Sequence, residues 1–529
     1  MGAPWELYGS AMGAHPGHRV IVCVPMSDER PGDGAPSSNG LPSTSADEPT
    51  SRRVFIKTTA AVAAAAAIGC SIDEPTVLPA DSGPAPDSAP PPDSGTPDSA
   101  VDGGDSGDGG PDPVEPPEST PENTDDFGLG VSSGDVTHED AIIWTRYSGG
   151  SGSLTMALWE MDGDDYLRVV AEGEIAPASG GFIHVAVTGL VGGRRYRYAF
   201  FEVQADERTR RSPIGRFRAA LAPGQQENII LGACSCTENG RPFDTLVRAG
   251  ERDDLDVFLL LGDTTYNDGA ITREEMRTRW AQNLGAAGYL EVRQKTSVLA
   301  TWDDHEVEDN FNPESADIEV AREAFFENLP LRRDLSEPER IWKSIRWGDT
   351  AEIFVLDCRS ERRRTTIGTT DIYISVEQME WLKAGLAASS AVFKLIVNSV
   401  PITEYPSLFD PALDDRWEGY TLQREEILSH IDDGSITGVL WVSGDFHFAS
   451  AQRVSPAGQA GATQIEILVG PGASHGNPAA FALGGEPQFD FVAETDNYVT
   501  MELMPATNTI RMSWIDREGT AFEVREYVV

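Results

Sequence analysis

Four short polar motifs each follow an apolar run that is typical of a buried strand. They read Ala233-Cys234-Ser235, Gly262-Asp263-Thr264-Thr265-Tyr266, Trp302-Asp303-Asp304-His305-Glu306 and Gly444-Asp445-Phe446-His447. The ends of neighbouring strands meet at one edge of an α/β sheet, so residues far apart in the chain can come together there. Thiol, carboxylate, phenol and imidazole groups are all metal ligands in proteins. The motifs therefore predict a metal site.

The chemistry that fits this set is hydrolysis of a phosphate ester by a pair of metal ions. Such a pair neutralises the phosphoryl oxygens and activates a water, and it needs one carboxylate shared between the ions. Asp263 follows the apolar run 257–261 and is the natural bridge, with Tyr266 within reach of the same ion. Asp445 and His447 are two residues apart, which places them on one face of a strand.

Two positions leave alternatives open. Cys236 competes with Cys234 as the sulfur ligand, and motif position favours Cys234. Asp303 competes with Asp304, and Asp303 is the one that could instead orient a ligand from behind. We expect Cys234 and Asp304 to be the ligands.

Alternating strand-like and helix-like segments predict an α/β domain over residues 226–529 that carries these motifs. The strand-like runs are 228–233, 256–261, 297–301, 352–356, 394–400, 437–443 and 464–469. The helix-like runs are 241–252, 272–284, 317–328, 376–388 and 421–432, and 496–528 is expected to be all β. Alternation of this kind predicts helices packed outside the sheet.

A smaller β-domain is expected over residues 127–222. Short alternating runs at 154–158, 182–187 and 196–200 are separated by glycine-rich turns, which is typical of an immunoglobulin- or fibronectin-like sandwich. No dense polar group of side chains occurs in it, so we expect it to be structural.

The first 70 residues resemble a Tat-type lipoprotein signal region. Arg52 and Arg53 precede an alanine-rich apolar run, and Ala67-Ile68-Gly69-Cys70 resembles a lipobox. Residues 71–126 hold 15 Asp and Glu and no Lys or Arg, and are rich in Pro, Ser and Gly. Such a stretch buries too little apolar surface to fold, so we expect a disordered acidic linker. The expected location is periplasmic or cell-surface, with a lipid anchor at Cys70.

The charge of the chain limits its partners. The net charge is -44, and an acidic surface disfavours nucleic acid or an anionic membrane as an electrostatic partner. An anionic substrate must therefore be held by local cations. The five cysteines do not form a disulfide framework.

The motifs resemble the PhoD-like alkaline phosphatase family, also called alkaline phosphatase/phospholipase D, of the calcineurin-like metallophosphoesterases. The resemblance covers roughly residues 127–529. It is carried by the run 302–308, by Gly130-Val131-Ser132-Ser133-Gly134-Asp135, by Trp144-Thr145-Arg146 and by Leu356-Asp357-Cys358-Arg359. It implies a four-layer α/β sandwich, and an enzyme that hydrolyses phosphate monoesters or diesters through a metal-activated water.

The resemblance also implies which residues do what. Ferric iron would be held by Cys234, Asp263, Tyr266 and His447, and calcium by Asp263, Asp304 and Asp445. His305 would face the phosphate and either stabilise the transition state or protonate the leaving group. Arg277 and Arg279 are the candidates for contact with the phosphate. The sequence departs from the family at Asp309-Asn310, where Asn-Asn is frequent.

Two other functions fit parts of the sequence. One is a surface-tethered lipoprotein that keeps the fold and binds a partner without catalysis, which the intact ligand set disfavours. The other is a different metallophosphoesterase, such as a nucleotidase or a purple-acid-type phosphatase, which the sulfur ligand and the Asp-Asp-His-Glu run disfavour. The natural ester and the oligomeric state are left open.

The lipobox gives a first testable prediction. Replacing the modified cysteine, Cys70→Ser, removes the only thiol that a lipid could occupy in that motif. We expect the variant to move from the membrane fraction to the soluble exported fraction, as measured by cell fractionation and immunoblotting. Continued membrane attachment of the variant would refute lipidation at this residue.

Overall fold

The computed structural model describes residues 22–23, 114–150 and 153–529. Most of the expected signal region and of the acidic linker lies outside these residues, so those expectations stay predictions. Within the described ranges, no helix is both long and apolar enough to cross a membrane.

The N-terminal strands form two facing sheets, as expected for a β-sandwich. One sheet has the order β5-β4-β7-β8 with β9 also on β7, and the other begins β1-β6-β3-β2. Buried side chains of both sheets, among them Ile143, Met156 and Tyr198, fill the space between them. The strands are β1 (Val22–Cys23), β2 (Val131–Gly134), β3 (Asp140–Arg146), β4 (Ser153–Asp162), β5 (Asp165–Ile175), β6 (Phe182–Thr188), β7 (Arg195–Gln204), β8 (Glu207–Arg211) and β9 (Gly215–Arg218).

The sandwich begins earlier in the chain than the sequence suggested. Residues 114–126, which the composition assigns to the linker, contain the 3-10 helix η1 (Pro117–Ser119) and pack on the sandwich. The Asn123 side chain is 5% exposed and donates to Glu202 Oε1 at 2.7 Å. The sequence did not show that this segment is folded, because its composition is acidic and rich in proline and its few buried side chains form no periodic pattern.

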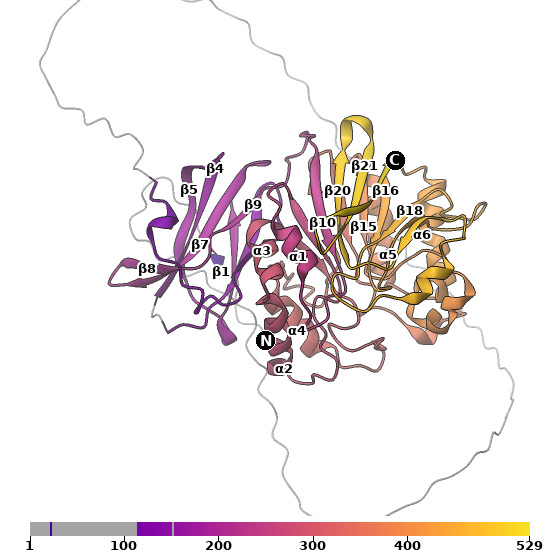
Figure 1. Cartoon of the computed structure of the whole chain (residues 1–529), viewed down its shortest axis with the longest axis horizontal. Helices are drawn as coiled ribbons and strands as arrows, with labels where there is room; N and C mark the ends of the chain where they lie inside the picture. The colour runs from indigo at the N-terminus through magenta and orange to yellow at the C-terminus, as the bar shows by residue number, and fades with distance from the viewer. Residues whose placement is uncertain (1–21, 24–113, 151–152) are drawn as a thin grey trace, which may run out of the picture. The chain divides into compact units, whose positions relative to one another are not determined.

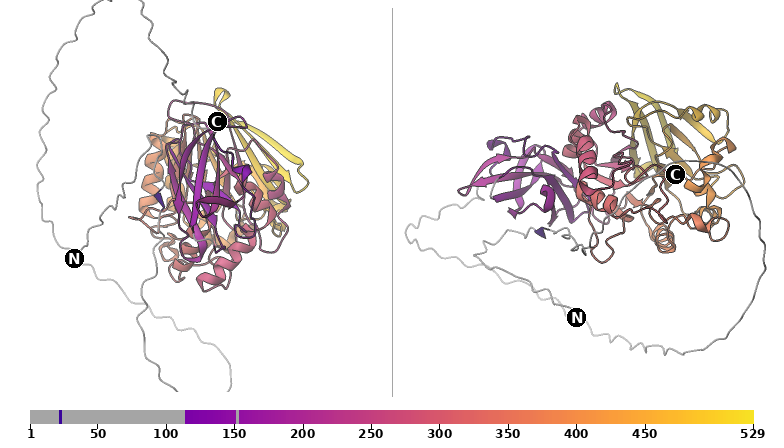
Figure 2. Two further views of the ribbon diagram at one scale, coloured as in Figure 1. Left: turned by 90° about the vertical axis from the view of Figure 1, so that its left-hand side faces the viewer. Right: turned by 90° about the horizontal axis from the view of Figure 1, so that it is seen from below.

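The C-terminal part contains two further groups of strands that face each other. In sheet order the first group is β12 (Ser297–Thr301), β11 (Val257–Leu261), β10 (Ile229–Cys234), β20 (Asn497–Met504), β21 (Thr509–Asp516) and β22 (Ala521–Val528). The second is β13 (Lys343–Trp347), β14 (Ala351–Val355), β15 (Phe393–Val397), β16 (Val439–Ser443), β18 (Ile465–Leu468), β17 (Ala449–Arg453) and β19 (Phe489–Ala493). Figure 1 shows both groups of strands, and Figure 2 gives two further views of them.

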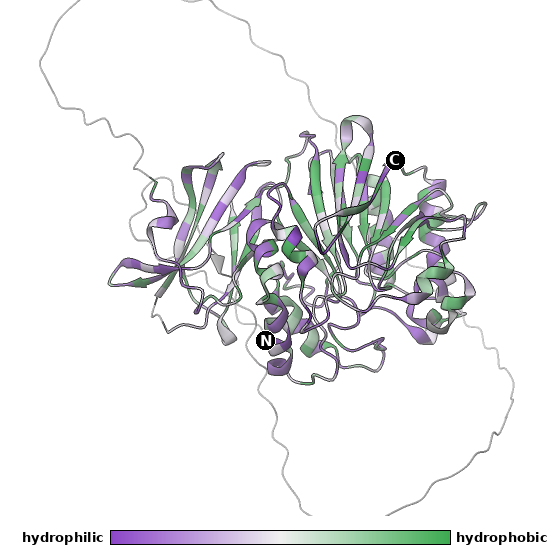
Figure 3. Ribbon diagram, viewed as in Figure 1, coloured by the Kyte–Doolittle hydropathy of each residue, from purple (hydrophilic) through white to green (hydrophobic). Residues whose placement is uncertain are grey.

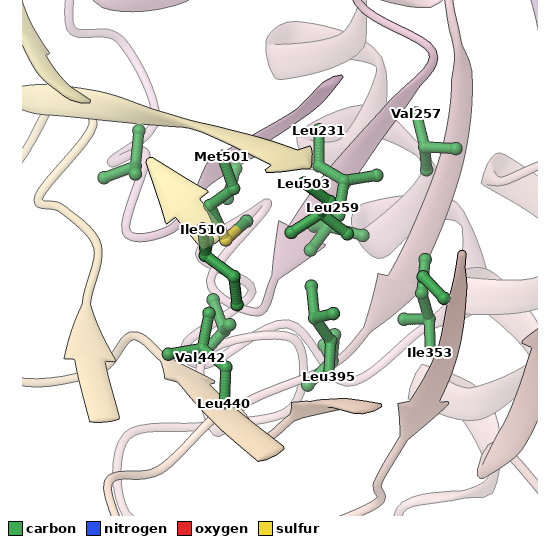
Figure 4. Packing of buried hydrophobic residues seen from close by; sticks show 14 of the residues in the cluster. Leu231, Val257, Leu259, Ile353, Leu395, Leu440, Val442, Met501, Leu503 and Ile510 are labelled. Carbon is green, nitrogen blue, oxygen red and sulfur yellow. The ribbon is translucent and has the colours of Figure 1, made fainter. Parts of the chain in front are cut away.

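Side chains alternate along these strands between the two faces of each sheet. In β11, Leu259 and Leu261 point into the core between the sheets, while Phe258 and Leu260 point to the helices outside. Figure 4 shows the inner core, with Leu259, Leu395 and Leu440 gathered between the sheets. Burying each leucine stabilises the fold by roughly 2 kcal/mol. Strands buried on both faces therefore read as continuous apolar runs, and Figure 3 shows them as largely hydrophobic.

Helices cover the outer face of each sheet. α1 (Asp244–Gly250), α2 (Arg273–Leu284), α3 (Ala287–Lys295) and α4 (Glu319–Asn328) supply the core outside the first sheet, and α5 (Val376–Ala388) and α6 (Thr421–Asp433) that outside the second. The order of layers is helix, sheet, sheet, helix, which confirms the predicted four-layer sandwich. Short 3-10 helices lie in the loops: η2 (Ser179–Gly181), η3 (Arg364–Thr366), η4 (Ser407–Asp415), η5 (Trp417–Gly419), η6 (Pro478–Ala482) and η7 (Pro505–Thr507).

Local side chains explain where the helices begin. Thr272 and Glu275 form a reciprocal capping box at the start of α2, which satisfies backbone N–H groups that the helix cannot. Ser375 Oγ accepts from Gln378 N at 3.1 Å at the start of α5. Both starts agree with the sequence expectation to within one residue.

The N-terminal β-sandwich and the C-terminal four-layer sandwich share a sheet. β2 pairs in parallel with β12, with Ser133 opposite Ser297, so one ten-stranded sheet runs through both. Next to this junction, Asp135 is 1% exposed and accepts from Lys343 Nζ at 2.6 Å and from Arg332 N at 2.6 Å. A buried ion pair therefore ties the end of β2 to the first residue of β13.

Removing the cation of this pair is expected to destabilise the protein. Lys343→Met leaves Asp135 buried without its counter-charge, and loss of one partner of a buried pair costs about 3 kcal/mol. The matched control is Lys295→Met, since Lys295 lies 3.9 Å from the exposed Asp253 and exposed pairs contribute under about 1 kcal/mol. Urea unfolding measures both. Equal, small effects of the two variants would contradict the assigned role of Asp135.

Candidate metal centre

The candidate site lies where strands of both central sheets end. β10, β11 and β12 are parallel neighbours, so the residues that follow them emerge at one edge. The loop after β16 of the second sheet meets them there: a Cβ atom on Gly444 would lie 2.6 Å from Ser235 Cβ. The close approach requires glycine at this position and brings the motif after β16 against the motif after β10.

Three overlapping groups of donor side chains occur at this edge. In each group, one ligand atom per residue lies within 4.8 Å of the others: Cys236, Asp263 and His447; Asp263, Asp304 and His305; Asp303, Asp304 and Asp445. Asp263 belongs to the first two groups, and Asp304 to the last two. The donors thus form a continuous row with Asp263 between a sulfur–nitrogen end and a carboxylate end.

The backbone at this edge adopts an uncommon conformation. Cys236, Asp263, Asp445 and His447 have φ values of 56°, 52°, 68° and 56°, in the left-handed region that non-glycine residues seldom occupy. Strained backbone of this kind costs of order 1 kcal/mol per residue and is concentrated at functional sites. Four such residues in one cluster therefore indicate a site held together for function.

The structure places Cys236, and not the expected Cys234, in this row. Cys234 is the last residue of β10 and its side chain joins the core under the outer helices. A Cβ atom on Gly472 would lie 2.3 Å from its sulfur, so that space is closed. Cys236 has left the strand, and its positive φ turns the thiol toward Asp263 and His447. The expected Cys234 is in none of the donor groups found among the described residues, because strand alternation ends before residue 236. Its role as the sulfur ligand stays a prediction.

His447 is prepared to act as a ligand through one nitrogen. Its Nδ1 lies 2.8 Å from the carbonyl oxygen of His475. A carbonyl can only accept, so Nδ1 carries the proton and Nε2 keeps its lone pair. Burial, more than any other cause, lowers the pKa of His447, which keeps the ring neutral near pH 7.

Tyr266 and His305 stack on each other beside Asp263. Their ring centroids are 4.0 Å apart, and Tyr266 Oη lies 3.4 Å from Asp263 Oδ2. His305 Nδ1 lies 2.9 Å from both oxygens of Asp268. Burial lowers the pKa of His305, but the hydrogen bond to Asp268 and the nearby carboxylates outweigh it and raise the pKa to about 10. The hydrogen bond to Asp268 thus favours the cationic ring, in which Nε2 also carries a proton.

Glu306 holds the loops after β11 and β12 together. Its carboxylate is fully buried and accepts from the backbone N–H groups of Asp263, Thr264 and Asp303, at 3.0, 2.6 and 2.8 Å. Burial raises its pKa to about 7 despite these bonds. Glu306 belongs to none of the three donor groups, and its hydrogen bonds go to the backbone, so we assign it the positioning of Asp263 and Asp303.

Arg359 is a buried cation that sequence reasoning did not assign. Its side chain is 0% exposed and forms ion pairs with Asp303 and Asp415, and its Nη2 lies 3.2 Å from Asp445 and 3.7 Å from Asp304. Its motif, 356–359, carried the family resemblance, which was the available signal. Arg359 thus binds one oxygen of Asp303 and approaches Asp304 and Asp445, so it places a positive charge next to the carboxylate end of the row.

Arg277 and Arg279, the expected phosphate contacts, are both engaged by other groups of the protein. Arg277 lies on α2 and is engaged by Glu327, with Nε 2.8 Å from Oε2, while its guanidinium lies over the Phe182 ring. Arg279 Nη1 donates to the backbone oxygen of Tyr266 at 2.9 Å. Arg279 thus supports the Tyr266 loop, and Arg277 supports the packing of α2 on α4. Helical spacing placed both on α2 but could not show which way each side chain extends.

The charges of the row fit a bound cation. Burial and then the neighbouring carboxylates Asp304 and Asp303 raise the pKa of Asp263 well above its usual range. Burial and then Asp303 do the same to the pKa of Asp445. Asp303 Oδ2 is buried and has no hydrogen-bond partner among the residues that the structure describes. A cation among these oxygens would offset the repulsion and lower those pKa values.

Comparison with known proteins agrees with this arrangement. The sequence model of the PhoD-like phosphatase family matches residues 231–520, and that of its N-terminal domain matches residues 114–221. The chain belongs to the PhoD-like phosphatase family. Membership confirms the resemblance that the four motifs indicated, and the family's N-terminal domain begins at residue 114, where the sandwich of this structure begins.

The individual relatives have low sequence identity to this chain. Alkaline phosphatase D of Bacillus subtilis (strain 168) is 26% identical over 393 residues, a match that spans 62% of this chain and 65% of the relative. A solved structure of PhoD has a TM-score of 0.66 at 21% identity, covering 76% of this chain and 90% of that one. A purple acid phosphatase from yellow lupin seeds has a TM-score of 0.54 at 12% identity, covering 75% and 73%. Both solved structures therefore share the fold of this chain.

The two cysteines allow a direct test of the candidate metal centre in this member of the PhoD-like family. Cys236→Ser replaces a soft sulfur by a weak hard ligand in the donor row, whereas Cys234→Ser changes the same residue type two positions away. We expect the first variant to lose at least tenfold in metal affinity, measured by elemental analysis after dialysis against graded chelator, and the second to keep it. The opposite pattern would restore Cys234 as the ligand.

Proposed function

We propose that this protein is a metal-dependent phosphatase or phosphodiesterase, a phosphoric ester hydrolase. The observation that carries the proposal is the row of donors in which Asp263 is shared by two groups. A shared carboxylate with separate donors on either side is what a pair of metal ions needs. The names of the relatives, alkaline phosphatase D and purple acid phosphatase, support the same reaction type.

The two ends of the row suit different ions. Cys236, Tyr266 and His447 offer sulfur, phenol and imidazole, which suit a transition metal such as ferric iron. Asp304 and Asp445 offer hard oxygens, which suit calcium. A bound pair would supply positive charge to the phosphoryl oxygens and an activated water. We therefore propose Fe³⁺ and Ca²⁺, with Asp263 between them.

The side chains around the row would complete the reaction. His305 carries a positive charge fixed by Asp268, so its Nε2–H can donate to a phosphoryl oxygen or give its proton to the leaving alcohol. Tyr266 limits the tilt of the His305 ring by stacking on it. Arg359 spreads its charge over Asp303, Asp304 and Asp445 from behind, which lets three carboxylates share a dry site.

The N-terminal sequence supports a location outside the cytoplasm. We propose export through the twin arginines and anchoring through Cys70, with the acidic segment 71–113 between anchor and enzyme. Export of a folded protein by that route would allow the metals to be loaded first. The substrate would then be a phosphate ester of the periplasm or cell surface.

The proposal is tested by measuring metal content together with turnover of nitrophenyl phosphate and bis-nitrophenyl phosphate. Asp263→Asn removes the shared charge, and we expect it to lower kcat/KM at least a thousandfold, equivalent to about 4 kcal/mol of transition-state stabilisation.

The control lies at the other end of the same strand. Asp256 immediately precedes β11 and pairs with Arg218 at 3.2 Å, so Asp256→Asn should change stability but keep metal content and turnover. A wild-type protein that binds no metal and hydrolyses neither ester would refute the proposed hydrolase function. Full activity in Asp263→Asn would show that the site is misplaced.

A further inference from the structure

An aromatic cluster lies directly beside the candidate ligands. Phe446 is the residue between Asp445 and His447, and its ring packs against Tyr405 at 4.8 Å and Phe409 at 5.8 Å between centroids. The rings of Phe409 and Phe446 are nearly parallel, with 5° between their planes. Burial raises the pKa of Tyr405, on which the Phe446 ring packs, and Asp445 is among the groups that raise it further, so the cluster adjoins the donor row.

The buried side of the cluster holds these two rings in place. Arg416 is 1% exposed, and its guanidinium lies 5.5 Å from the centre of the Phe446 ring. Arg416 Nη2 also donates to the backbone oxygen of Phe409 at 2.7 Å, so one side chain fixes both rings. Tyr405 and Phe448 close the base of the cluster and are buried. Phe446 and Phe409 remain half-buried, which leaves part of each ring open to solvent.

The surroundings of these open rings are also apolar. Ala480 of η6 and Leu483, which follows η6, pack into the same cluster, while Phe481 of η6 is 86% exposed. Leu408, next to Phe409, is 60% exposed. Exposed apolar side chains on the segments that carry this cluster are unexpected in a chain with a net charge of -44. Exposed apolar surface of this kind marks a ligand-binding site, and continuity with the metal centre makes the substrate the ligand.

We propose that Phe446 and Phe409 form the leaving-group subsite, which selects phosphate esters whose alcohol is aromatic. The proposal rests on the hydrolase function proposed above and names its substrate class. A phosphate held at the donor row would bring its alcohol group beside this cluster, where a flat apolar group can stack on the Phe446 ring. The rings are already fixed by Arg416 and by each other, so stacking orders little that is mobile.

The test compares 1-naphthyl phosphate with ethyl phosphate. The ratio of their kcat/KM values cancels effects on the metals, because both esters need the same centre. One aromatic contact corresponds to about a fivefold effect, so Phe446→Ser should lower the naphthyl-to-ethyl ratio about fivefold and Phe446→Tyr should preserve it. Phe409→Ser should lower the ratio in the same direction.

The matched control is Phe448→Leu. Phe448 belongs to the same cluster, with its ring 6.0 Å from that of Phe446, but it is 0% exposed. We expect a lower melting temperature and an unchanged ratio. A second readout does not depend on turnover: calorimetry of phenylphosphonate and methylphosphonate on the metal-loaded protein should show the same fivefold change in the ratio of affinities for Phe446→Ser.

The outcomes separate the two proposals. Turnover with a ratio unchanged in Phe446→Ser, or an equal loss for both esters, overturns the aromatic subsite and leaves the hydrolase function standing. No turnover of either ester and no binding of either phosphonate overturns the hydrolase function and the subsite with it.

Discussion

The site depends on keeping several carboxylates close together away from water. Asp263, Asp303, Asp304 and Asp445 are gathered at one edge, and their mutual repulsion adds to the cost of burial. The protein itself offsets only part of this, through Arg359 behind the row and the cationic His305 in front of it. Cations bound in the row would offset the rest. Affinity for metal and strain in the metal-free protein are thus two aspects of one arrangement.

The arrangement also explains why the two central sheets must face each other. Asp263, Asp303 and Asp304 follow strands of the first sheet, whereas Asp445 and His447 follow β16 of the second. Arg359 comes from the loop after β14 and crosses to Asp303 of the first sheet. The site therefore forms only when the apolar core between the sheets closes, which couples ligand geometry to the packing of residues such as Leu259 and Leu440.

Much of the fold could be predicted from the sequence, because buried strands and amphipathic helices have clear periods. The seven main strands and five helices expected in the larger domain all occur. The sequence was least informative where the chain leaves its regular strands and helices. Cys236 and Asp263 have positive φ, so counting along a strand could not show where the Cys236 thiol points. The sequence pointed to Arg277 and Arg279 on α2 as the cations of the site. Only the tertiary structure shows that the buried Arg359 reaches four carboxylates.

The sheet shared by the two domains has a consequence for how the protein comes apart. Because β2 pairs with the edge strand β12, the N-terminal sandwich extends the first central sheet and is joined to it by backbone hydrogen bonds. Excising residues 114–221 would leave an unpaired parallel edge open to another chain, a template for aggregation. The sandwich thus protects the edge of β12 from pairing with another chain. Because the two domains share this sheet, they should unfold in a single cooperative transition.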